Sequence, residues 1–428
     1  MALGLPEMID ASSTADVGGL AARRWGQLAL GIVCMVAMAN VQYGWTLFIN
    51  PIDQKYAWGT TALQWTFSIV IATETFVGMP LAGYFLDRFG PKLVCLSGPL
   101  VAVAWYLNSI ADALHLFYVA AVISGLGTGL VFAAAYQNAQ KWFPDQRGFA
   151  IGLTAAGFAG GGVATVVPLD SMIKLSGYEA AYLWFGIGQG LVVLASGLAL
   201  RAPRQDELTA LLPARPAQRK HDYAPLEVLR SPPFWLMYAM FVMVGAGGLM
   251  LQAQLGPVAR DLGVDKVPMS ILGFTMLTPI LAVSFGQVAN GFSRPTFGWL
   301  SDRIGRERTM FIAFLLEAVA FVAVILFADS PLWFVLLTGL VYFAWGEIFS
   351  LFPAICTDTY GNKFLSVNYG LLYTAKGVAS LLVPFASMLK DAAGSWSYVF
   401  MAVAALNAIA AVLALVLRHA RKRFMAGA

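Results

Sequence analysis

Two stretches of the chain follow one pattern. Residues 78–92 read GMPLAGYFLDRFGPK, and residues 293–307 read SRPTFGWLSDRIGRE. At a constant offset of 215 residues the copies share a proline, a glycine and an Asp-Arg turn: Pro80 and Pro295, Gly83 and Gly298, Asp87 and Asp302, Arg88 and Arg303. A shorter repeat links TAAG at 154–157 to TAKG at 374–377, at an offset of 220. Repeats spread this widely predict a chain built as two related halves.

The composition is typical of a membrane protein. Apolar residues make up 59% of the 428 residues and charged residues only 12%, whereas a soluble domain has roughly 25% charged residues. We predict an all-α integral protein of the lipid bilayer, with twelve transmembrane helices in two six-helix pseudo-symmetric bundles, because twelve apolar stretches each approach the ~20 residues that cross a bilayer. They are residues 26–48, 63–86, 93–111, 116–140, 148–173, 179–200, 232–255, 271–300, 309–328, 331–356, 366–389 and 396–418.

The positive charges predict the topology. With the N-terminus in the cytoplasm, 20 of the 27 Lys and Arg residues fall on the cytoplasmic side and five fall in the outer loops. This bias follows the positive-inside rule and places both termini in the cytoplasm. The predicted organisation is a cytoplasmic N-terminal tail (1–22), a six-helix bundle (23–200), a cytoplasmic linker (201–231), a second six-helix bundle (232–418) and a basic cytoplasmic tail (419–428).

Several other classes of function find no support in the sequence. Residues 1–22 are polar, so no cleaved signal is expected. The three cysteines and three histidines form no pattern of a disulfide framework, a metal site or a catalytic cluster. Glycine clusters at 125–129, 157–162 and 245–248 lie inside apolar spans, where they favour close helix packing and not nucleotide loops. We expect no enzyme activity, no cofactor or metal ion, and no nucleic-acid partner.

Two cationic residues remain inside the predicted spans. Arg294 lies eight residues before Asp302, about 12 Å along a helix, and Lys376 lies ten residues after Ser366, about 15 Å. Both therefore lie near the middle of the bilayer. A charge there costs ~2.5–3.5 kcal/mol, which predicts an internal position with a partner or access to water.

The repeat indicates that the fold does not need these charges, because the equivalent positions in the first half are the neutral Met79 and Ala156. In one interpretation, both cations form fixed ion pairs with carboxylates inside the spans, for which the candidates are Glu74, Glu317 and Glu347. In the other, they hold an anionic substrate, with Arg294 gripping a carboxylate through two parallel hydrogen bonds and Lys376 supplying a point charge. Two cations added to one half favour the second interpretation and suit a small dianion.

The repeated loops resemble the signature of the major facilitator superfamily, G-x-L-x-D-R-x-G-R-K. The first copy, GYFLDRFGPK, departs from it at Phe85 and Pro91, and the second, GWLSDRIGRE, departs at Glu307. The resemblance implies a transporter whose substrate site lies at the interface of its halves. It also implies that these loops stabilise and gate closure on the cytoplasmic side. The implied gating residues are Gly83, Asp87, Arg88, Gly298, Asp302 and Arg303.

Longer motifs resemble the oxalate:formate antiporter family within this superfamily. They are VQYGWTLFINP (41–51), KWFPDQRG (141–148), NGFSRPTFGWLSDRIGR (290–306) and NYGLLYTAKG (368–377). The resemblance implies that Arg294 and Lys376 bind a dicarboxylate between aromatic walls. The matching wall positions are Tyr43, Phe132, Phe158, Trp345, Phe349 and Tyr373. Three phenylalanines stand where the family pattern has tyrosine, and Tyr373 where it has tryptophan, so the cavity is expected to be more apolar.

Two carboxylates are candidates for coupling, Glu347 and Glu74. Glu347 lies two residues after Trp345, where the family pattern has a small residue. If Glu347 faces the cavity, it either neutralises one cation, which favours a monocarboxylate, or titrates and couples transport to protons. If it faces packed helices, it has no role in transport. The sequence leaves the orientation of both carboxylates open.

These patterns together predict a monomeric oxalate:formate antiporter of a bacterial inner membrane, working by alternating access. Exchange is expected because an empty cavity leaves two cations that repel each other, whereas a bound anion neutralises them and lets the gate close. A proton-coupled monocarboxylate symporter is the alternative, favoured by Glu347 and by the missing tyrosine hydroxyls. A non-transporting receptor for carboxylates is a more distant alternative.

Overall fold

The structure is a bundle of helices in two halves, and this computed structural model describes residues 11–211, 221–271 and 274–426. The first half contains α1 (Ala11–Tyr43), α2 (Trp45–Tyr56), α3 (Thr60–Ala72), the π-helix η1 (Thr73–Gly78), α4 (Met79–Phe89), the 3₁₀-helix η2 (Pro91–Leu96), α5 (Ser97–Ile110), α6 (Leu114–Trp142) and α7 (Arg147–Ala199). The second half contains α10 (Pro232–Asp261), β1 (Pro268–Ile271), β2 (Phe274–Leu277), α11 (Thr278–Ile304), α12 (Arg306–Phe327), α13 (Pro331–Trp345), α14 (Ile348–Tyr360), α15 (Leu365–Leu381), α16 (Val383–Ala393) and α17 (Trp396–Ala426).

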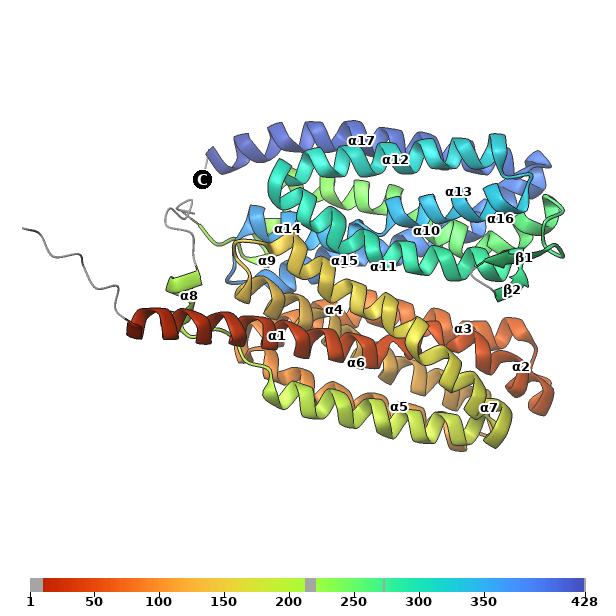
Figure 1. Cartoon of the computed structure of the whole chain (residues 1–428), viewed down its shortest axis with the longest axis horizontal. Coiled ribbons are helices and arrows are strands. Elements are labelled where there is room, and N and C mark those ends of the chain that lie inside the picture. Colours follow the sequence, from red (N-terminus) through yellow and green to blue (C-terminus); the bar gives the residue numbers. More distant parts are fainter. Residues whose placement is uncertain (1–10, 212–220, 272–273, 427–428) are drawn as a thin grey trace, which may run out of the picture.

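The two halves lie side by side, with their long helices running in one general direction (Figure 1). The start of α1 and the end of α17 lie at the same end of the bundle, which we call the termini end; β1 and β2 lie at the opposite end, which we call the hairpin end (Figure 1). The segment between the halves contains the short helices α8 (Gln205–Leu211) and α9 (Pro225–Leu229) at the termini end. Residues 212–220 of the predicted linker, 1–10 of the predicted N-terminal tail and 427–428 of the C-terminal tail lie outside the described residues.

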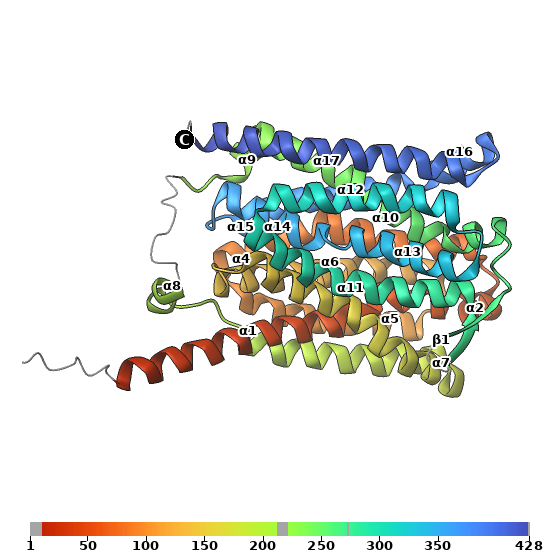
Figure 2. The ribbon, with the colours of Figure 1, turned by 45° about the horizontal axis from the view of Figure 1, so that its top comes forward.

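Ten helical segments of the described chain are long and apolar enough to cross a membrane. The helices α11 and α15 are not among the ten, and these two carry Arg294 and Lys376. A central charge lowers the hydropathy of α11, and α15 has only 17 residues before it breaks. Since α11 runs along the bundle beside the other helices (Figure 2), we count both with the ten to reach the twelve predicted spans.

Several predicted spans are interrupted in the structure. Residues 26–48 break at Gly44, residues 331–356 break after Trp345, and residues 366–389 break at Leu382. The second span, 63–86, passes through the π-helix η1. Breaks inside membrane spans are tolerated where neighbouring protein satisfies the freed backbone groups, and they are common around the substrate sites of transporters.

The prediction that the eighth span begins at residue 271 is wrong. Strands β1 and β2 pair antiparallel, with Pro268 opposite Leu277, and α11 begins only at Thr278. Proline in the first turn favours this start, because it has no N–H to leave unpaired. By contrast, the boundary between the fifth and sixth spans falls where it was predicted. There α7 kinks at Gly177, whose φ of 85° is readily adopted only by glycine.

The halves meet along two helix pairs, α4 with α15 and α7 with α11. A Cβ placed on Gly83 would stand 2.6 Å from the backbone of Ser366, and one placed on Gly298 would stand 2.1 Å from the carbonyl oxygen of Gly148. Closer to the middle of the bundle, a Cβ on Gly152 would stand 2.3 Å from the Arg294 carbonyl oxygen. Small residues of this kind let transmembrane helices approach closely. The repeated glycines therefore bring the two halves into backbone contact.

Candidate functional site

The two cations inside the bundle both lie close to one aromatic ring. Arg294 on α11 and Lys376 on α15 are both buried, at 3% and 4% exposure. The guanidinium carbon of Arg294 is 4.5 Å from the centre of the Phe349 ring, and the Lys376 Nζ is 5.9 Å from the same centre. The structure thus brings together two side chains that are 82 positions apart in the chain. Cations are attracted to the faces of aromatic rings.

Arg294 is held by uncharged groups. Its two terminal nitrogens donate to the Ala155 carbonyl at 2.6 Å and to the Asn290 Oδ1 at 2.7 Å. Its Nε is buried without a hydrogen-bond partner, and the described residues place no carboxylate in an ion pair with it. The positive charge of Arg294 is therefore uncompensated in this structure, and one of its donors is unused.

Asn290 contacts Arg294, and the sequence analysis did not single it out. It is 1% exposed, accepts from Arg294 and donates through Nδ2 to the Tyr342 carbonyl at 3.0 Å. The signal was present, because Asn290 precedes Arg294 by four residues and side chains at that spacing share one face of a helix. Asn290 fixes the direction in which the guanidinium points.

Lys376 has a carboxylate partner, contrary to the expectation that both cations repel each other in an empty site. Its Nζ lies 3.1 Å from the Glu74 Oε1 and 3.0 Å from the Tyr373 hydroxyl oxygen. The Tyr373 hydroxyl in turn donates to the same Glu74 oxygen at 3.1 Å. Glu74 belongs to η1 in the first half, so this ion pair joins the two halves. A π-helix is rare and occurs frequently at functional sites.

The expected aromatic residues form two groups near the cations. The ring centres are 5.2 Å apart for Tyr43 and Phe158, 4.7 Å for Phe158 and Phe132, and 6.1 Å for Phe132 and Tyr373. In the second group, Trp345 lies edge-on to Phe349 at 5.7 Å. These side chains come from six helices of both halves.

Glu347 and Glu317 stand apart from the two cations. Both are fully buried, and in the described part of the chain neither carboxylate has a hydrogen-bond partner or an ion pair with Arg294 or Lys376. Glu317 lies beside Gly247 and Asn407, since a Cβ on that glycine would meet the Glu317 Oε1 at 3.0 Å and the Asn407 Nδ2 at 3.2 Å. Of the three candidate glutamates, Glu74 is the one that the described structure pairs with a cation.

The gating residues expected from the repeat lie at the termini end. Asp87 accepts from the N–H groups of Ser366 and Val367 at 3.2 and 3.1 Å, at the N-terminus of α15. Asp302 accepts from Gly148 and Phe149 at 3.1 and 2.9 Å, at the N-terminus of α7. A carboxylate at a helix N-terminus also interacts favourably with the helix dipole. Each half therefore caps a helix of the other half, which closes the termini end.

The arginines of the repeat do not take part in these contacts. Arg88 and Arg303 instead lie over the neighbouring rings of Phe89 and Trp299. A different pair joins the halves at this end, because Arg147 of α7 contacts Asp358 of α14 at 2.9 Å. Within the second half, Arg306 pairs with Asp358 at 2.9 Å and also with Asp302. The sequence analysis did not single out this network.

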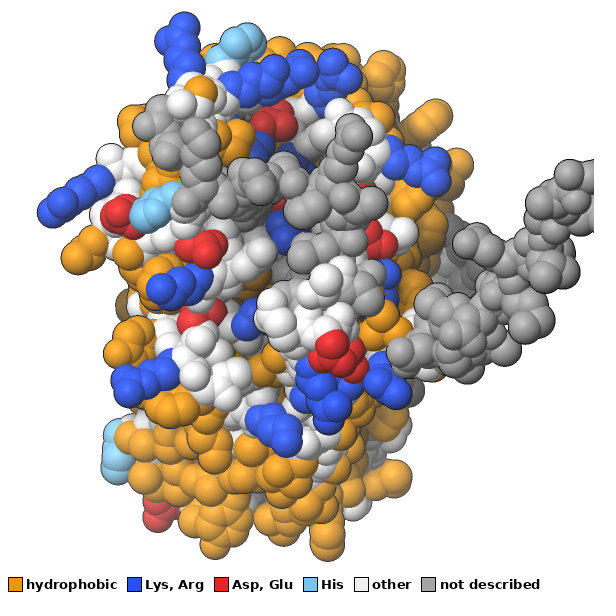
Figure 3. All heavy atoms as spheres, turned by 90° about the vertical axis from the view of Figure 1, so that its left-hand side faces the viewer, with side chains coloured by type: hydrophobic (Ala, Val, Ile, Leu, Met, Phe, Trp, Pro, Cys, Tyr) orange, Lys and Arg blue, Asp and Glu red, His pale blue; other side chains and the backbone are white. Residues whose placement is uncertain are grey.

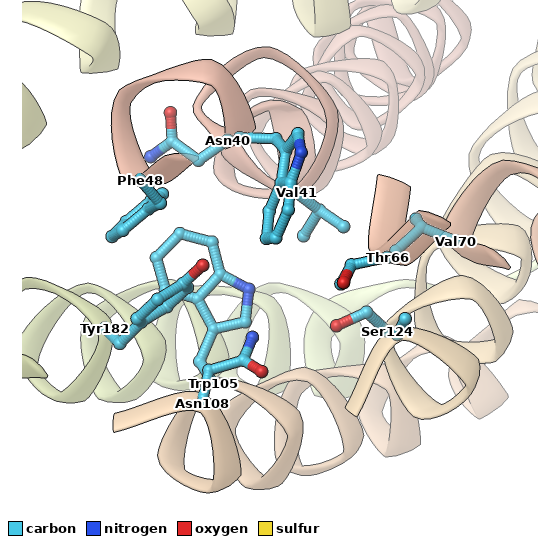
Figure 4. A pocket seen from close by; sticks show the side chains of 11 residues that line it. Asn40, Val41, Phe48, Thr66, Val70, Trp105, Asn108, Ser124 and Tyr182 are labelled. Atoms are coloured by element: carbon cyan, nitrogen blue, oxygen red, sulfur yellow. The ribbon is translucent and has the colours of Figure 1, made fainter. Parts of the chain in front are cut away.

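Two hollows elsewhere do not suit a carboxylate. One, inside the first half, leaves about 20 Å³ for the centre of a water molecule, which is close to the room one water needs. It lies among Asn40, Thr66, Trp105, Asn108 and Ser124 (Figure 4). The other, of about 800 Å³, is a groove on the outside of α7 and α11 with a mainly apolar lining that includes Leu153, Val288 and Phe292. Neither contains Arg294 or Lys376.

Comparison with known proteins agrees with this arrangement. The model of the Major Facilitator Superfamily matches residues 28–291 and 267–427. The oxalate:formate antiporter of Oxalobacter formigenes is 32% identical over 409 residues, covering 94% of this chain and 93% of its own. The chain belongs to the oxalate:formate antiporter family of the major facilitator superfamily. It is therefore a multi-pass membrane transporter of the secondary type and not an enzyme.

More distant members of the superfamily match over most of the chain. The monocarboxylate transporter 13 of Rattus norvegicus is 24% identical, covering 84% of this chain and 78% of its own. Among solved structures, the proton:xylose symporter XylE superimposes with a TM-score of 0.67 at 14% identity, covering 92% of this chain and 95% of its own. At that identity the likeness to XylE shows the fold alone.

Proposed function

We propose that this transporter exchanges small carboxylates, oxalate against formate, by binding them between Arg294 and Lys376. The observation that carries the proposal is the pair of buried cations that share the Phe349 ring, at the interface of the halves. The unused Nε of Arg294 lets the guanidinium offer a second hydrogen bond to a carboxylate. Aromatic side chains beside the cations would favour a small, flat anion over a bulky one. The 32% identity to an oxalate:formate antiporter supports the same substrate class.

The structure represents a state closed at the termini end. Lys and Arg side chains gather over that end (Figure 3), and positive charge concentrates on the cytoplasmic side of membrane proteins. The termini end is then cytoplasmic, in a bacterial inner membrane. Opening requires that the Asp87 and Asp302 contacts break, and binding of an anion to the uncompensated Arg294 favours reclosure.

The test is uptake of labelled oxalate into proteoliposomes preloaded with formate, with oxalate or with buffer alone. We expect uptake to need an internal anion and to be lost in Arg294→Ala and Lys376→Ala. Uptake that is indifferent to internal anion, or that survives both substitutions, would reject the proposal.

A proton-coupled monocarboxylate symporter is the second candidate, because Glu74 compensates Lys376 and leaves one net positive charge at the site. The likeness to monocarboxylate transporter 13 agrees with it. This candidate predicts acid-stimulated uptake of formate or lactate into vesicles that contain no anion. The same proteoliposomes measured at two pH values therefore separate the two candidates.

A further inference from the structure

The site holds a third charge, the Glu74 carboxylate. We propose that Glu74 is an internal counter-anion that competes with substrate for Lys376, so that the Glu74–Lys376 pair decides between monoanions and dianions. The inference rests on the proposed function, in which Arg294 and Lys376 bind the carboxylate. It goes beyond that function because it proposes that Glu74, a residue of the first half, selects between substrates of different charge.

The placement of Glu74 fits a competitor and not a surface ion pair. Its side chain is 0% exposed, and its Oε1 is shared by Lys376 and the Tyr373 hydroxyl, each at 3.1 Å. Its Oε2 is buried without a hydrogen-bond partner. A buried carboxylate with half of its acceptors unused is held less firmly than a fully bonded one, because an unpaired buried polar atom costs free energy. Glu74 is thus a partner that a better anion can replace.

The charges at the site give the rule for selection. Glu74 contributes one negative charge and the two cations contribute two positive charges, so one positive charge, on Arg294, is left over. A monoanion such as formate completes neutrality on Arg294 and leaves the Glu74–Lys376 pair intact. A dianion such as oxalate can use its second carboxylate only if Lys376 turns away from Glu74. The displaced Glu74 then keeps the Tyr373 hydroxyl as its donor but faces a second negative charge nearby, which disfavours the dianion.

The same pair affects the empty carrier. When Glu74 pairs with Lys376, the empty carrier closes around one unpaired cation, Arg294. Without the Glu74 charge, it closes around two unpaired cations. Closing on two buried like charges is costlier, because their repulsion is strong in a medium of low dielectric. Glu74 therefore permits some return of the empty carrier, and its neutralisation makes transport more strictly an exchange.

The experiment compares the full-length wild type with Glu74→Gln, which keeps the shape and removes the charge. Inhibition constants for formate, acetate, oxalate and malonate are measured by competition in proteoliposomes, and efflux into anion-free buffer is compared with exchange. A coupling of ordinary size corresponds to about 5–150-fold in affinity. We expect the preference for dianions over monoanions to rise by at least about tenfold, and the ratio of net efflux to exchange to fall. Glu317→Gln, which removes another fully buried carboxylate, is the matched control and should leave both ratios unchanged.

The outcomes are separable. Active exchange in Glu74→Gln with an unchanged preference would overturn the role of Glu74 and leave the proposed function standing. The proposed function itself would be rejected if the wild type exchanged none of the four anions, or if its exchange were unchanged in Arg294→Ala. If Glu74→Gln fails to fold, Glu74→Asp is the second variant, because its shorter side chain keeps the charge but moves it away from Lys376. The preference for dianions should then rise by less than in Glu74→Gln. No shift in a folded Glu74→Asp would then count against the proposal.

Discussion

The carboxylate of Asp302 in α11 accepts a hydrogen bond of 2.9 Å from the backbone N–H of Phe149 at the start of α7. The two residues belong to different halves. The repeat supplies the equivalent contact, since Asp87 in α4 accepts from Val367 at the start of α15 at 3.1 Å. Two copies of one motif thus cap helices reciprocally across the interface of the halves, and we expect closure of the termini end to depend on both.

Neutralising these carboxylates should open the termini end. A hydrogen bond to a charged group contributes about 1.5–3 kcal/mol, so we expect Asp302→Asn to raise the population of the open state about tenfold or more. The measurement is the labelling rate of a single cysteine placed at Gln140, which is buried at this end, in a background without the three native cysteines. Asp329→Asn, which changes an exposed aspartate elsewhere in the second half, is the control. Equal labelling of the two variants would contradict the role assigned to Asp302.

A methyl group on the repeated glycine should block the same closure. The Cβ of Gly298→Ala would stand 2.1 Å from the Gly148 carbonyl oxygen, so the backbones must separate. We expect exchange to fall by at least about tenfold, because a shift of 1.4 kcal/mol against the closed state already has that effect. On the same helix, Gly291→Ala meets only the Ala159 Cβ at 3.4 Å and serves as control. Retained exchange in Gly298→Ala would show that the halves need not approach this closely.

Removing the side chain that directs Arg294 should weaken substrate binding. Asn290→Ala leaves a guanidinium nitrogen without its acceptor, a loss of about 1–3 kcal/mol, and the freed arginine has more orientations to lose on binding. We expect the KM for oxalate to rise about 5–100-fold, with a smaller effect on the maximal rate. Asn290→Asp should raise it further, because the new carboxylate would neutralise Arg294. An Asn290→Asp protein with wild-type KM would exclude Arg294 from the binding site.

A pH effect is expected at the termini end, where α8 docks. The Arg201 guanidinium, which contacts Glu207 at 2.7 Å, lowers the pKa of Glu207 to about 2. Because the folded-state pKa is below the unfolded value near ~4.3, this pair stabilises the fold above pH ~4.3 and loses its contribution as the pH falls toward 2. We expect Glu207→Gln to melt below the wild type at pH 7 and the difference to shrink between pH 5 and pH 3. A constant difference over that range would show that Glu207 acts through packing and not through its charge.

The sequence predicts the number and grouping of the transmembrane spans better than it predicts the breaks inside them. The repeat and the apolar stretches predict two six-helix bundles, and glycine at position 177 marks a kink because a positive φ favours that residue. The breaks at Gly44 and after Trp345 are not evident, because apolar composition continues through them. Hydropathy reports burial in lipid or protein and is insensitive to whether the backbone inside is regular.

The candidate site shows a similar division. The cations and the aromatic residues near them can be recognised from the sequence alone, because charge in an apolar span is costly and the family motifs flank both cations. The partner of Lys376 cannot be recognised in this way, because Glu74, Glu317 and Glu347 are all glutamates inside apolar spans. The choice between them depends on depth and on the helix face, and for Glu74 it depends on a π-helix that shifts the register of its side chains.

The reciprocal caps also bear on ancestry. Because Asp87 and Asp302 make equivalent contacts, a protein assembled from two identical copies of one half would already close symmetrically. Met79 and Ala156 occupy, in one copy, the positions at which the other copy has Arg294 and Lys376. The reciprocal caps are therefore common to both copies, whereas Arg294 and Lys376 are particular to the second copy. Such an ancestor would have needed neither cation for its closing contacts.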